Sequence, residues 1–350
     1  MDIASVTVIV PVFNGSASGL VTCLESVFQQ TYMKMNVIII DDYSSDNSIE
    51  LINQLIRRFH KECTVITHKA NHGLSKSLNE GIELSSGSYV LILQQDCSLK
   101  TKTTLEESIE FMTANNYKVL VGSSSIDWGT LNIYQKLFKI RISEQFTSSV
   151  LSDRIYVSQL KCDIFKREVF EIVGKFDFTN KTVGQDFIMS SKLYEKSISM
   201  FTYNNFVYNI QYKGEDMLSS LCKKEFRYAF AVPYVLKNWY DSGFLKNNDT
   251  NQSKVKKYSR FFNLFFPMIL VLLLVASSFM GFPITITLIA ILISFWILRI
   301  LTIIMAPLRN YSSLPEFIIS VFVFILLDII YLIGVLFGIP TLLKLVHPLN

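Results

Sequence analysis

Short apolar runs alternate with helical stretches over the first 210 residues, and this alternation limits the fold more than any other feature of the sequence. Four runs have the character of strands, at residues 6–10, 36–40, 64–67 and 89–93. Amphipathic stretches between and after them fit helices, at residues 19–30, 45–60 and 75–85. Continuous apolar runs such as V-I-I-I are typical of strands that are covered on both faces. The order predicts an α/β fold with a doubly wound, Rossmann-like sheet, whose ligands lie at the carboxyl ends of the strands.

The apolar residues concentrate after residue 260, in three stretches that each have about the ~20 residues that a spanning helix needs. They lie at about residues 261–282, 284–306 and 317–339. Lysines and an arginine gather just before the first stretch, which by the positive-inside rule predicts that the α/β domain is cytoplasmic. We therefore expect a multi-pass protein of the cell membrane in three parts. These are an α/β domain over 1–212, an amphipathic juxtamembrane linker over 213–260 and a membrane domain with three transmembrane helices over 261–350.

Composition and cysteine usage exclude several classes of protein. The net charge of +4 is small, and no basic run is interleaved with aromatic residues, so nucleic acid is not an expected partner. The five cysteines are scattered without a C-x-x-C or Cys/His cluster, which predicts neither a zinc site nor a disulfide framework. Half of the residues are hydrophobic, which indicates an anchored enzyme or a small transporter. Three spans without a pair of broken helices give a transporter no obvious pathway.

Polar and aromatic side chains follow the first two expected strands at the edge where a ligand would bind. Phe13 follows the first strand, and Asp41 and Asp42 follow the second. Two acids at the tip of a buried strand are costly unless they face a cleft, so we interpret them as ligand-binding residues. Asp42 can accept a hydrogen bond from a nucleobase N–H while Phe13 stacks on the ring. For Asp46 and Ser44, which follow closely, capping of the next helix is the alternative interpretation.

Four motifs occur in order over about ninety residues. They are P-V-F-N from Pro11, D-D-Y-S-S-D-N-S from Asp41, N-H-G-L-S-K-S-L-N-E-G-I from Asn71, and G-S-Y-V-L-I-L-Q-Q-D ending at Asp96. In this order and spacing they resemble glycosyltransferase family 2, which has the GT-A fold. The resemblance implies transfer of a sugar from a nucleotide-diphosphate donor, with inversion at the anomeric carbon and help from a divalent metal, Mg²⁺ or Mn²⁺. The residues that it implies for donor binding are Pro11, Phe13, Asn14, Asp41, Asp42, Asn71, Gly73, Lys76, Gln94 and Gln95.

At the end of the fourth motif, this sequence has Gln94, Gln95 and Asp96 where the family carries an acid-x-acid triplet. The resemblance implies that Asp96 is the metal ligand and that Gln94 lies on the ribose side of the donor, where its amide can still hydrogen-bond a hydroxyl. A hard cation keeps several waters and takes other ligands from the substrate's diphosphate, so one acid can suffice. The lost acid leaves open an enzyme that binds metal weakly or works without it.

Two further roles follow from the resemblance. Many relatives carry an arginine where this chain has Leu78, so the cation for the phosphates must come from elsewhere, and Lys76 is the candidate. In T-V-G-Q-D-F the usual acidic pair is reduced to Asp186. An inverting transfer needs one carboxylate to deprotonate the acceptor hydroxyl, and we expect Asp186 to be that general base. Because a helix is expected from residue 187, an N-cap role for Asp186 is the other interpretation.

We therefore expect a membrane-anchored, inverting glycosyltransferase that uses a nucleotide sugar. A cytosolic donor and a bilayer anchor suit a membrane-associated acceptor, a polyprenyl- or lipid-linked glycan in polysaccharide or glycoprotein biosynthesis, with membrane lipids as further partners. The alternatives are a polyprenyl-phosphate monoglycosyl synthase and a non-catalytic membrane scaffold on the same fold. Association with a second copy of the chain stays open.

Overall fold

The computed structural model describes most of the first 243 residues and one long helix near the carboxyl end. The described residues are 4–125, 127–146, 150–151, 154–155, 157–177, 184–211, 217–243, scattered positions between 286 and 297, and 314–342. The expected spans at about 261–282 and 284–306 fall outside these residues, apart from those scattered positions.

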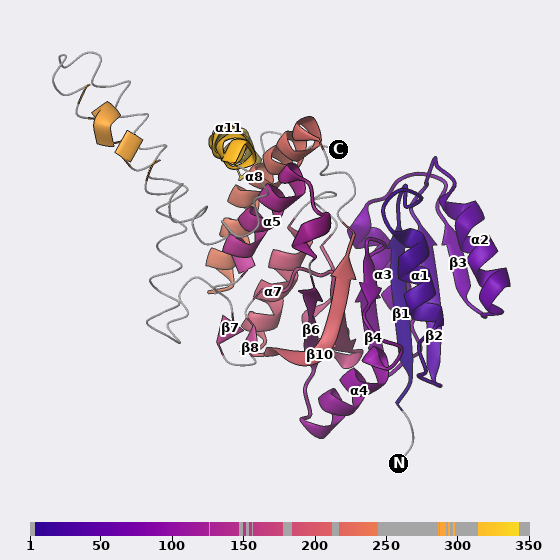
Figure 1. Cartoon of the computed structure of the whole chain (residues 1–350). Coiled ribbons are helices and arrows are strands. Elements are labelled where there is room, and N and C mark those ends of the chain that lie inside the picture. The colour runs from indigo at the N-terminus through magenta and orange to yellow at the C-terminus, as the bar shows by residue number, and fades with distance from the viewer. Residues whose placement is uncertain are drawn as a thin grey trace.

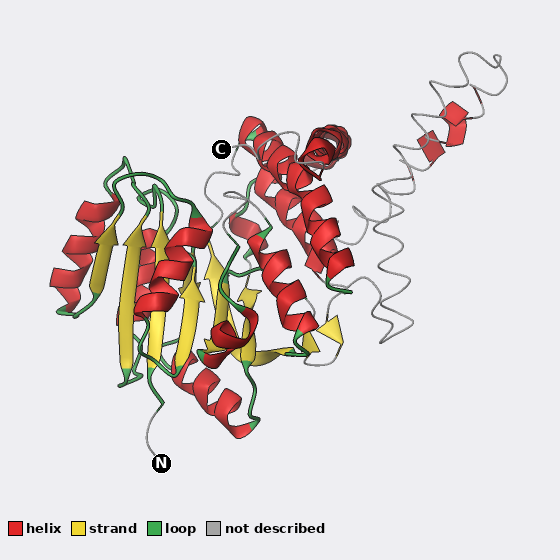
Figure 2. Cartoon of the chain, turned by 180° about the vertical axis from the view of Figure 1, so that it is seen from behind, coloured by secondary structure: helices red, strands yellow, loops and turns green. Residues whose placement is uncertain are grey.

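One sheet of ten strands forms the centre of the α/β domain (Figure 2). Its strands are β1 (Val6–Val12), β2 (Met35–Asp41), β3 (Thr64–Thr67), β4 (Tyr89–Leu93), β5 (Cys97–Leu99), β6 (Val119–Ser125), β7 (Val150–Leu151), β8 (Arg154–Ile155), β9 (Cys162–Lys166) and β10 (Met200–Ile210). Their order is β3-β2-β1-β4-β9-β6-β10-β8-β7, and β5 pairs with β10. The four strands expected from the sequence are all present, which confirms the α/β fold class.

The sheet is mixed, because β9 runs antiparallel between the parallel strands β4 and β6. The register pairs Leu93, the last residue of β4, with Cys162, the first residue of β9. The start of β9 therefore lies at the edge where β1, β2 and β4 end. β10 then continues the sheet, parallel to β6 and antiparallel to β5.

Helices cover both faces of this sheet and bury a core on each. The helices are α1 (Leu20–Phe28), α2 (Ser48–Phe59), α3 (Leu74–Leu84), α4 (Thr104–Ala114), α6 (Glu168–Val173) and α7 (Gln185–Glu195). One core contains apolar side chains of α1, α2 and α4, such as Leu24, Ile52 and Ile109. The other contains side chains of α3, α6 and α7, such as Leu78 and Leu193. This arrangement explains why the strands are apolar on both faces.

Three more helices form a separate group beside the β6 and β10 side of the sheet (Figure 1). They are α5 (Ile133–Phe146), α8 (Leu218–Asp241) and α11 (Leu314–Leu342). Leu137 and Phe138 of α5, Leu221 of α8 and Phe324 of α11 share one apolar cluster. Within α11, the segment Ile318–Pro340 is long and apolar enough to cross a membrane, judged by length and composition alone. It corresponds to the third expected span.

Glycines allow α8 and α11 to approach closely. A Cβ atom added at Gly334 would lie 2.6 Å from the Cβ of Ala229, and one added at Gly338 would overlap the carbonyl of Phe230. The two glycines are four residues apart and so lie on the same face of α11. This spacing of small residues lets helix backbones pack against each other.

Candidate active site

The candidate site lies at the carboxyl ends of β1, β2 and β4. The register pairs Val12 with Asp41, so the tips of β1 and β2 are level. Pro11 lies inside β1, opposite Ile40, whereas the pairing of β1 with β4 stops at Ile9. Proline has no N–H to donate to a sheet, and here it lies beyond the last residue paired with β4.

Phe13 is held at the tip of β1 by a glutamine from the loop after β4. Oε1 of Gln95 accepts the N–H of Phe13 at 2.8 Å, and Nε2 donates to the Phe13 carbonyl at 2.9 Å. The Phe13 residue is nevertheless 46% exposed. Gln95 therefore fixes the backbone beneath an accessible aromatic ring.

The loops after β1 and β2 are tied together through Asn14. Its backbone N–H donates to Oγ of Ser44 at 2.9 Å, and its Oδ1 accepts the N–H of Ser45 at 2.8 Å. Asp46 anchors the same region, because Oδ2 accepts from the Ser16 N–H at 2.9 Å while Oδ1 accepts from the Ser48 N–H at 3.1 Å. Ser48 is the first residue of α2, and its N-cap residue is Asn47, so Asp46 satisfies a free N–H of that helix from the position before the cap.

The two acids at the end of β2, Asp41 and Asp42, differ in their contacts. Both oxygens of Asp42 are engaged, accepting from the backbone N–H groups of His72 at 2.8 Å and Gly73 at 2.7 Å. Asp41 accepts from the N–H of Ser44 through Oδ2, while its buried Oδ1 has no hydrogen-bond partner among the described residues. Asp41 therefore has the unused acceptor, and Asp42 positions the loop that contains Gly73. Contact of Asp42 with a base stays a prediction.

A histidine that the sequence did not single out completes the contacts of Asp42. Nδ1 of His68 lies 2.7 Å from Asp42 Oδ1, and Nε2 lies 2.7 Å from Oε2 of Glu80 on α3. Burial acts to lower the pKa of His68, but hydrogen bonds to Asp42 and Glu80 outweigh burial and raise that pKa above its usual value. The imidazole links the tip of β2 to α3.

The centre of the site contains an ion pair. Nζ of Lys161 donates to Oδ2 of Asp96 at 2.6 Å and to Oε1 of Gln94 at 2.9 Å. Lys161 directly precedes β9, and the N–H of Gln94 donates to its carbonyl at 2.9 Å. The antiparallel register of β4 and β9 thus places the lysine beside the glutamine and the acid. The carbonyl of Asp96 also accepts the Gln211 N–H at 2.8 Å, just beyond the end of β10.

This arrangement does not fit the metal site that was expected at Asp96. One carboxylate oxygen of Asp96 and the amide oxygen of Gln94 both accept from an ammonium group, and the other carboxylate oxygen accepts from Sγ of Cys97 at 3.4 Å. Among the residues that the structure describes, no group of three or more acids, histidines or cysteines could hold a metal ion. A hard divalent cation takes several oxygen ligands. Here the amide oxygen of Gln94 and one carboxylate oxygen of Asp96 already contact the ammonium of Lys161.

Positive charge gathers around this pair. Burial acts to raise the pKa of Asp96, but the charge of Lys161 outweighs burial and holds that pKa below its usual range. Lys139 of α5, only 6% exposed, donates to Oγ of Ser124 at 3.2 Å, and burial lowers its pKa to about 8. The charge of Lys224 on α8 also acts on Asp96. Lys161 and Lys224 therefore both act on Asp96, and the charge of Lys161 also acts on Lys139.

Asp186 lies in the first turn of α7, where Gly184, and not Asp186, is the N-cap residue, with a φ of 98°. Oδ1 of Asp186 accepts the N–H of Phe187 at 2.9 Å. Burial raises the pKa of Asp186 to about 7, although the positive charge of Lys161 acts in the opposite direction. A carboxylate with a pKa near neutrality suits general base catalysis.

Residues 7–174 match the family described as glycosyl transferase family 2. This part of the chain belongs to glycosyltransferase family 2.

Curated relatives of the family-2 domain match over part of their length. An uncharacterized glycosyltransferase of Haemophilus influenzae is 30% identical over 126 residues, which cover 35% of this chain and 48% of that protein. Glycosyltransferase GlyA of Streptococcus pneumoniae is 24% identical over 219 residues, which cover 57% of this chain and 30% of that protein. The chain thus spans less than half of the length of either relative.

A solved structure shares the fold of this chain. The mannosyltransferase PcManGT from Pyrobaculum calidifontis, in complex with GDP-Man and Mn²⁺, superposes with a TM-score of 0.60 at 16% identity. The superposition covers 95% of this chain and 87% of the other. It shows the GT-A fold, as the motifs predicted.

The roles that the family-2 motifs predicted stay predictions, and the motifs did not point to several of the side chains that lie around Asp96 and Asp42. Asn71 and Lys76 are both exposed, at the start of the loop that leads to α3 and on α3 itself. Lys161 was missed, although a lysine directly before the apolar run C-D-I-F was a visible signal. The sequence did not point to Lys139, Lys224 or His68, because each lies far in the sequence from the residue that it contacts or whose pKa it changes.

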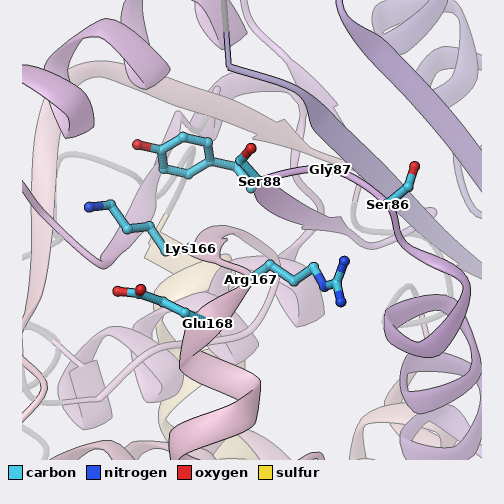
Figure 3. Close-up of a pocket in the computed structure, with 7 residues that line it drawn as sticks. Ser86, Gly87, Ser88, Lys166, Arg167 and Glu168 are labelled. Carbon is cyan, nitrogen blue, oxygen red and sulfur yellow. The ribbon is translucent and has the colours of Figure 1, made fainter.

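A surface pocket lies at the opposite edge of the family-2 sheet (Figure 3). It is lined by Ser86, Gly87, Ser88, Tyr89, Lys166, Arg167 and Glu168. Tyr89 begins β4 and is paired with Lys166, the last residue of β9. The pocket is therefore at the far end of these two strands from Asp96, and it forms no part of the candidate active site.

Proposed function

We propose that the chain is an inverting glycosyltransferase that moves a sugar from a nucleotide-diphosphate sugar to a membrane-associated acceptor, a polyprenyl- or lipid-linked glycan. One observation carries this proposal. The N–H of Ser158, in the turn that leads to Lys161, donates to Oγ of Ser190 on α7 at 3.3 Å. The start of α7, which contains the proposed base, therefore lies beside the turn that brings Lys161 to Asp96. The family membership of residues 7–174 and the complex of PcManGT with GDP-Man support a nucleotide-sugar donor.

The nucleoside would bind between the tips of β1 and β2. The accessible ring of Phe13 offers a stacking surface, and the free Oδ1 of Asp41 offers an acceptor for a base N–H. Stacking and a single directed hydrogen bond are the means by which proteins bind bases. Asn14, Gln95 and Gly73 hold these loops in place, so their contribution to donor binding is to position the backbone.

Asp186 would act on the acceptor. Its carboxylate removes the proton from the acceptor hydroxyl while the hydroxyl oxygen bonds to the anomeric carbon. The bond between that carbon and the diphosphate oxygen breaks, and the electron pair leaves with the diphosphate. The negative charge that develops on the leaving group requires a positive partner in the site. A divalent metal would be such a partner, as the Mn²⁺ of PcManGT suggests, but Asp96 is already paired.

The acceptor proposal rests on α11. Its segment Ile318–Pro340 has the length and composition of a span, and large apolar side chains such as Phe322 and Phe337 are exposed on it. Such a helix would anchor the α/β domain at the cytoplasmic surface of the cell membrane, within reach of a lipid-linked acceptor. Of the two candidate reactions, we favour extension of a lipid-linked glycan over glycosylation of a polyprenyl phosphate.

The test is release of nucleoside diphosphate from a panel of nucleotide sugars by the full chain in detergent with membrane lipid extract. Turnover with one donor, lost in Asp186→Asn and kept in the matched surface variant Asp241→Asn, is the expected result. Asp241 is exposed and pairs with Lys237 on α8, far in sequence from the site residues. No turnover with any donor, despite nucleotide binding, would favour the non-catalytic scaffold.

A further inference from the structure

Lys161 stands where the family-2 resemblance implies a divalent metal. Its ammonium nitrogen contacts Oδ2 of Asp96 and Oε1 of Gln94, the two residues that match the ends of the acid-x-acid triplet. It therefore occupies a carboxylate oxygen of Asp96, the residue expected to bind the metal, and also contacts Gln94. A lysine there is a fixed point charge with three N–H donors.

The net charge of the site is the same whether it holds two acids and a divalent metal ion or holds Asp96, Gln94 and Lys161. Two acids and a divalent ion together are neutral, and one acid, one amide and one ammonium together are neutral as well. The sequence has lost an acid at Gln94 and holds a cation at Lys161. The two changes compensate each other, which explains why the lost acid leaves no unbalanced charge at the end of β4.

The turn before β9 is built to hold Lys161 in this position. Leu160 has a φ of 51°, in the left-handed region that a branched side chain rarely adopts. Its N–H donates to Oγ of Ser158 at 2.7 Å, and the Ser158 hydroxyl in turn donates to the buried carboxyl of Asp163. The Leu160 carbonyl accepts from Nε2 of Gln94 at 2.8 Å. A strained residue is kept only where its surroundings enforce it.

A second lysine extends the positive surface. The buried ammonium of Lys139 has the neutral hydroxyl of Ser124 as its hydrogen-bond partner within the described part of the chain. Ser124 lies near the carboxyl end of β6, on the same edge as Asp96. A buried ammonium with a neutral partner retains its attraction for an anion.

We propose that Lys161, assisted by Lys139, binds the diphosphate of the donor in place of a divalent metal ion. The inference rests on the proposed function, because it assigns the phosphate-binding residues of that same site. As the sugar transfers, the bond from the anomeric carbon to the diphosphate oxygen breaks. The oxygen keeps the electron pair, and an N–H of Lys161 donates a hydrogen bond to it. Nucleotide binding and transfer then need no divalent ion.

The experiment measures binding of the nucleoside diphosphates UDP, GDP, CDP, ADP and dTDP to the full chain by calorimetry, with EDTA and then with Mn²⁺ or Mg²⁺. The wild-type protein is expected to bind at least one of them with dissociation constants that differ less than threefold between these conditions. Lys161→Met is expected to weaken that binding at least tenfold, and Lys139→Met to weaken it by a smaller factor. Lys237→Met is the matched control, since Lys237 pairs with Asp241 on α8, and it is expected to bind as wild type.

An exchange of charges gives a second test. The double variant Gln94→Asp with Lys161→Ala restores the acid-x-acid triplet and removes the ammonium. It is expected to bind the nucleotide with Mn²⁺ and to lose at least tenfold in affinity with EDTA. If it binds equally well under both conditions, Lys161 does not stand in for a metal. Lys161→Arg keeps the charge and is expected to retain binding in EDTA, which covers the case in which Lys161→Met does not fold.

The outcomes separate this inference from the proposed function. Nucleotide binding and turnover that both vanish with EDTA in the wild-type protein would overturn the inference and leave the glycosyltransferase in place. Binding in EDTA that depends on Lys161, without turnover of any sugar donor, would support the inference and overturn the proposed activity. Absence of binding under every condition would overturn both.

Discussion

The ammonium of Lys161 lies 2.6 Å from Oδ2 of Asp96, a residue 65 positions earlier in the chain. Each side chain is 26% exposed, so water screens the pair only in part. Removal of one partner from such a pair leaves the other charge without compensation, which costs more than loss of an exposed pair. The pair therefore contributes to the stability of the protein and to the electrostatics of the site.

Asp96→Asn is expected to lower the free energy of unfolding by about 2 kcal/mol, because it strips the carboxylate from Lys161. Denaturant unfolding of the metal-free protein at pH 7.5 measures this change. Asp241→Asn, which breaks an exposed pair within α8, is expected to cost about 0.5 kcal/mol or less. Equal stability of wild type and Asp96→Asn would contradict the ion pair.

Activity is expected to rise with pH through about 7, the value to which burial raises the pKa of Asp186. The base must be ionised to accept a proton, so the rate falls below this pKa. Above about pH 8, the value to which burial lowers the pKa of Lys139, loss of that ammonium lowers the rate again. The measurement is kcat/KM between pH 5.5 and 9. Asp186→Asn should lower kcat by roughly 100-fold or more, and a flat wild-type profile would argue against a base with this pKa.

Asp163 is expected to make the protein less stable as pH rises. Burial raises its pKa from 3.8 to about 7, with Asp186 acting in the same direction. The folded state therefore binds a proton more tightly than the unfolded state, and this contribution is lost between pH 4 and 7. The loss is on the order of 4 kcal/mol at most, from the size of the shift.

Unfolding of wild type and Asp163→Asn at pH 5, 6, 7 and 8 checks this expectation. The variant removes the titrating group, so its stability should fall less steeply with pH than that of wild type. Parallel curves for the two proteins would show that Asp163 keeps an ordinary pKa in the fold.

Phe13→Ala is expected to weaken nucleotide binding about tenfold, since base stacking on an aromatic side chain contributes roughly 1–3 kcal/mol. Phe13→Tyr keeps the stacking surface and should bind as wild type. Tyr240→Ala is the control, because Tyr240 is an exposed aromatic residue of α8. Calorimetry with nucleoside diphosphate measures all three, and normal affinity in Phe13→Ala would remove Phe13 from the donor site.

Gly338→Val is expected to destabilise the packing of α8 against α11, because a Cβ at Gly338 would overlap the carbonyl of Phe230. Overpacking of this kind costs about 1–3 kcal/mol. The measurement is the midpoint of thermal unfolding in detergent. Leu336→Ala, on an exposed part of α11, serves as control, and a midpoint unchanged in Gly338→Val would contradict the close approach.

The sequence predicted the parts of the site that follow from local pattern. The ends of β1, β2 and β4 could be placed within two residues, because apolar runs and the polar residues after them mark the strand tips. It could not predict the partner of Asp96. That partner depends on an antiparallel strand that inserts between β4 and β6, and pairing between distant strands leaves no local signal. The same holds for Asp42, whose oxygens are taken by the backbone of a loop about 30 residues later.

The position of β10 has a consequence for any shortened version of the protein. The match to the family ends at residue 174, yet β10 pairs with both β5 and β6, and the Gln211 N–H holds the backbone of Asp96. A fragment that ends at residue 174 would leave β6 as an exposed edge strand, which is prone to aggregate. It would also lack Asp186. An expression fragment of the α/β domain must therefore extend at least to Gln211 to fold autonomously and remain monodisperse.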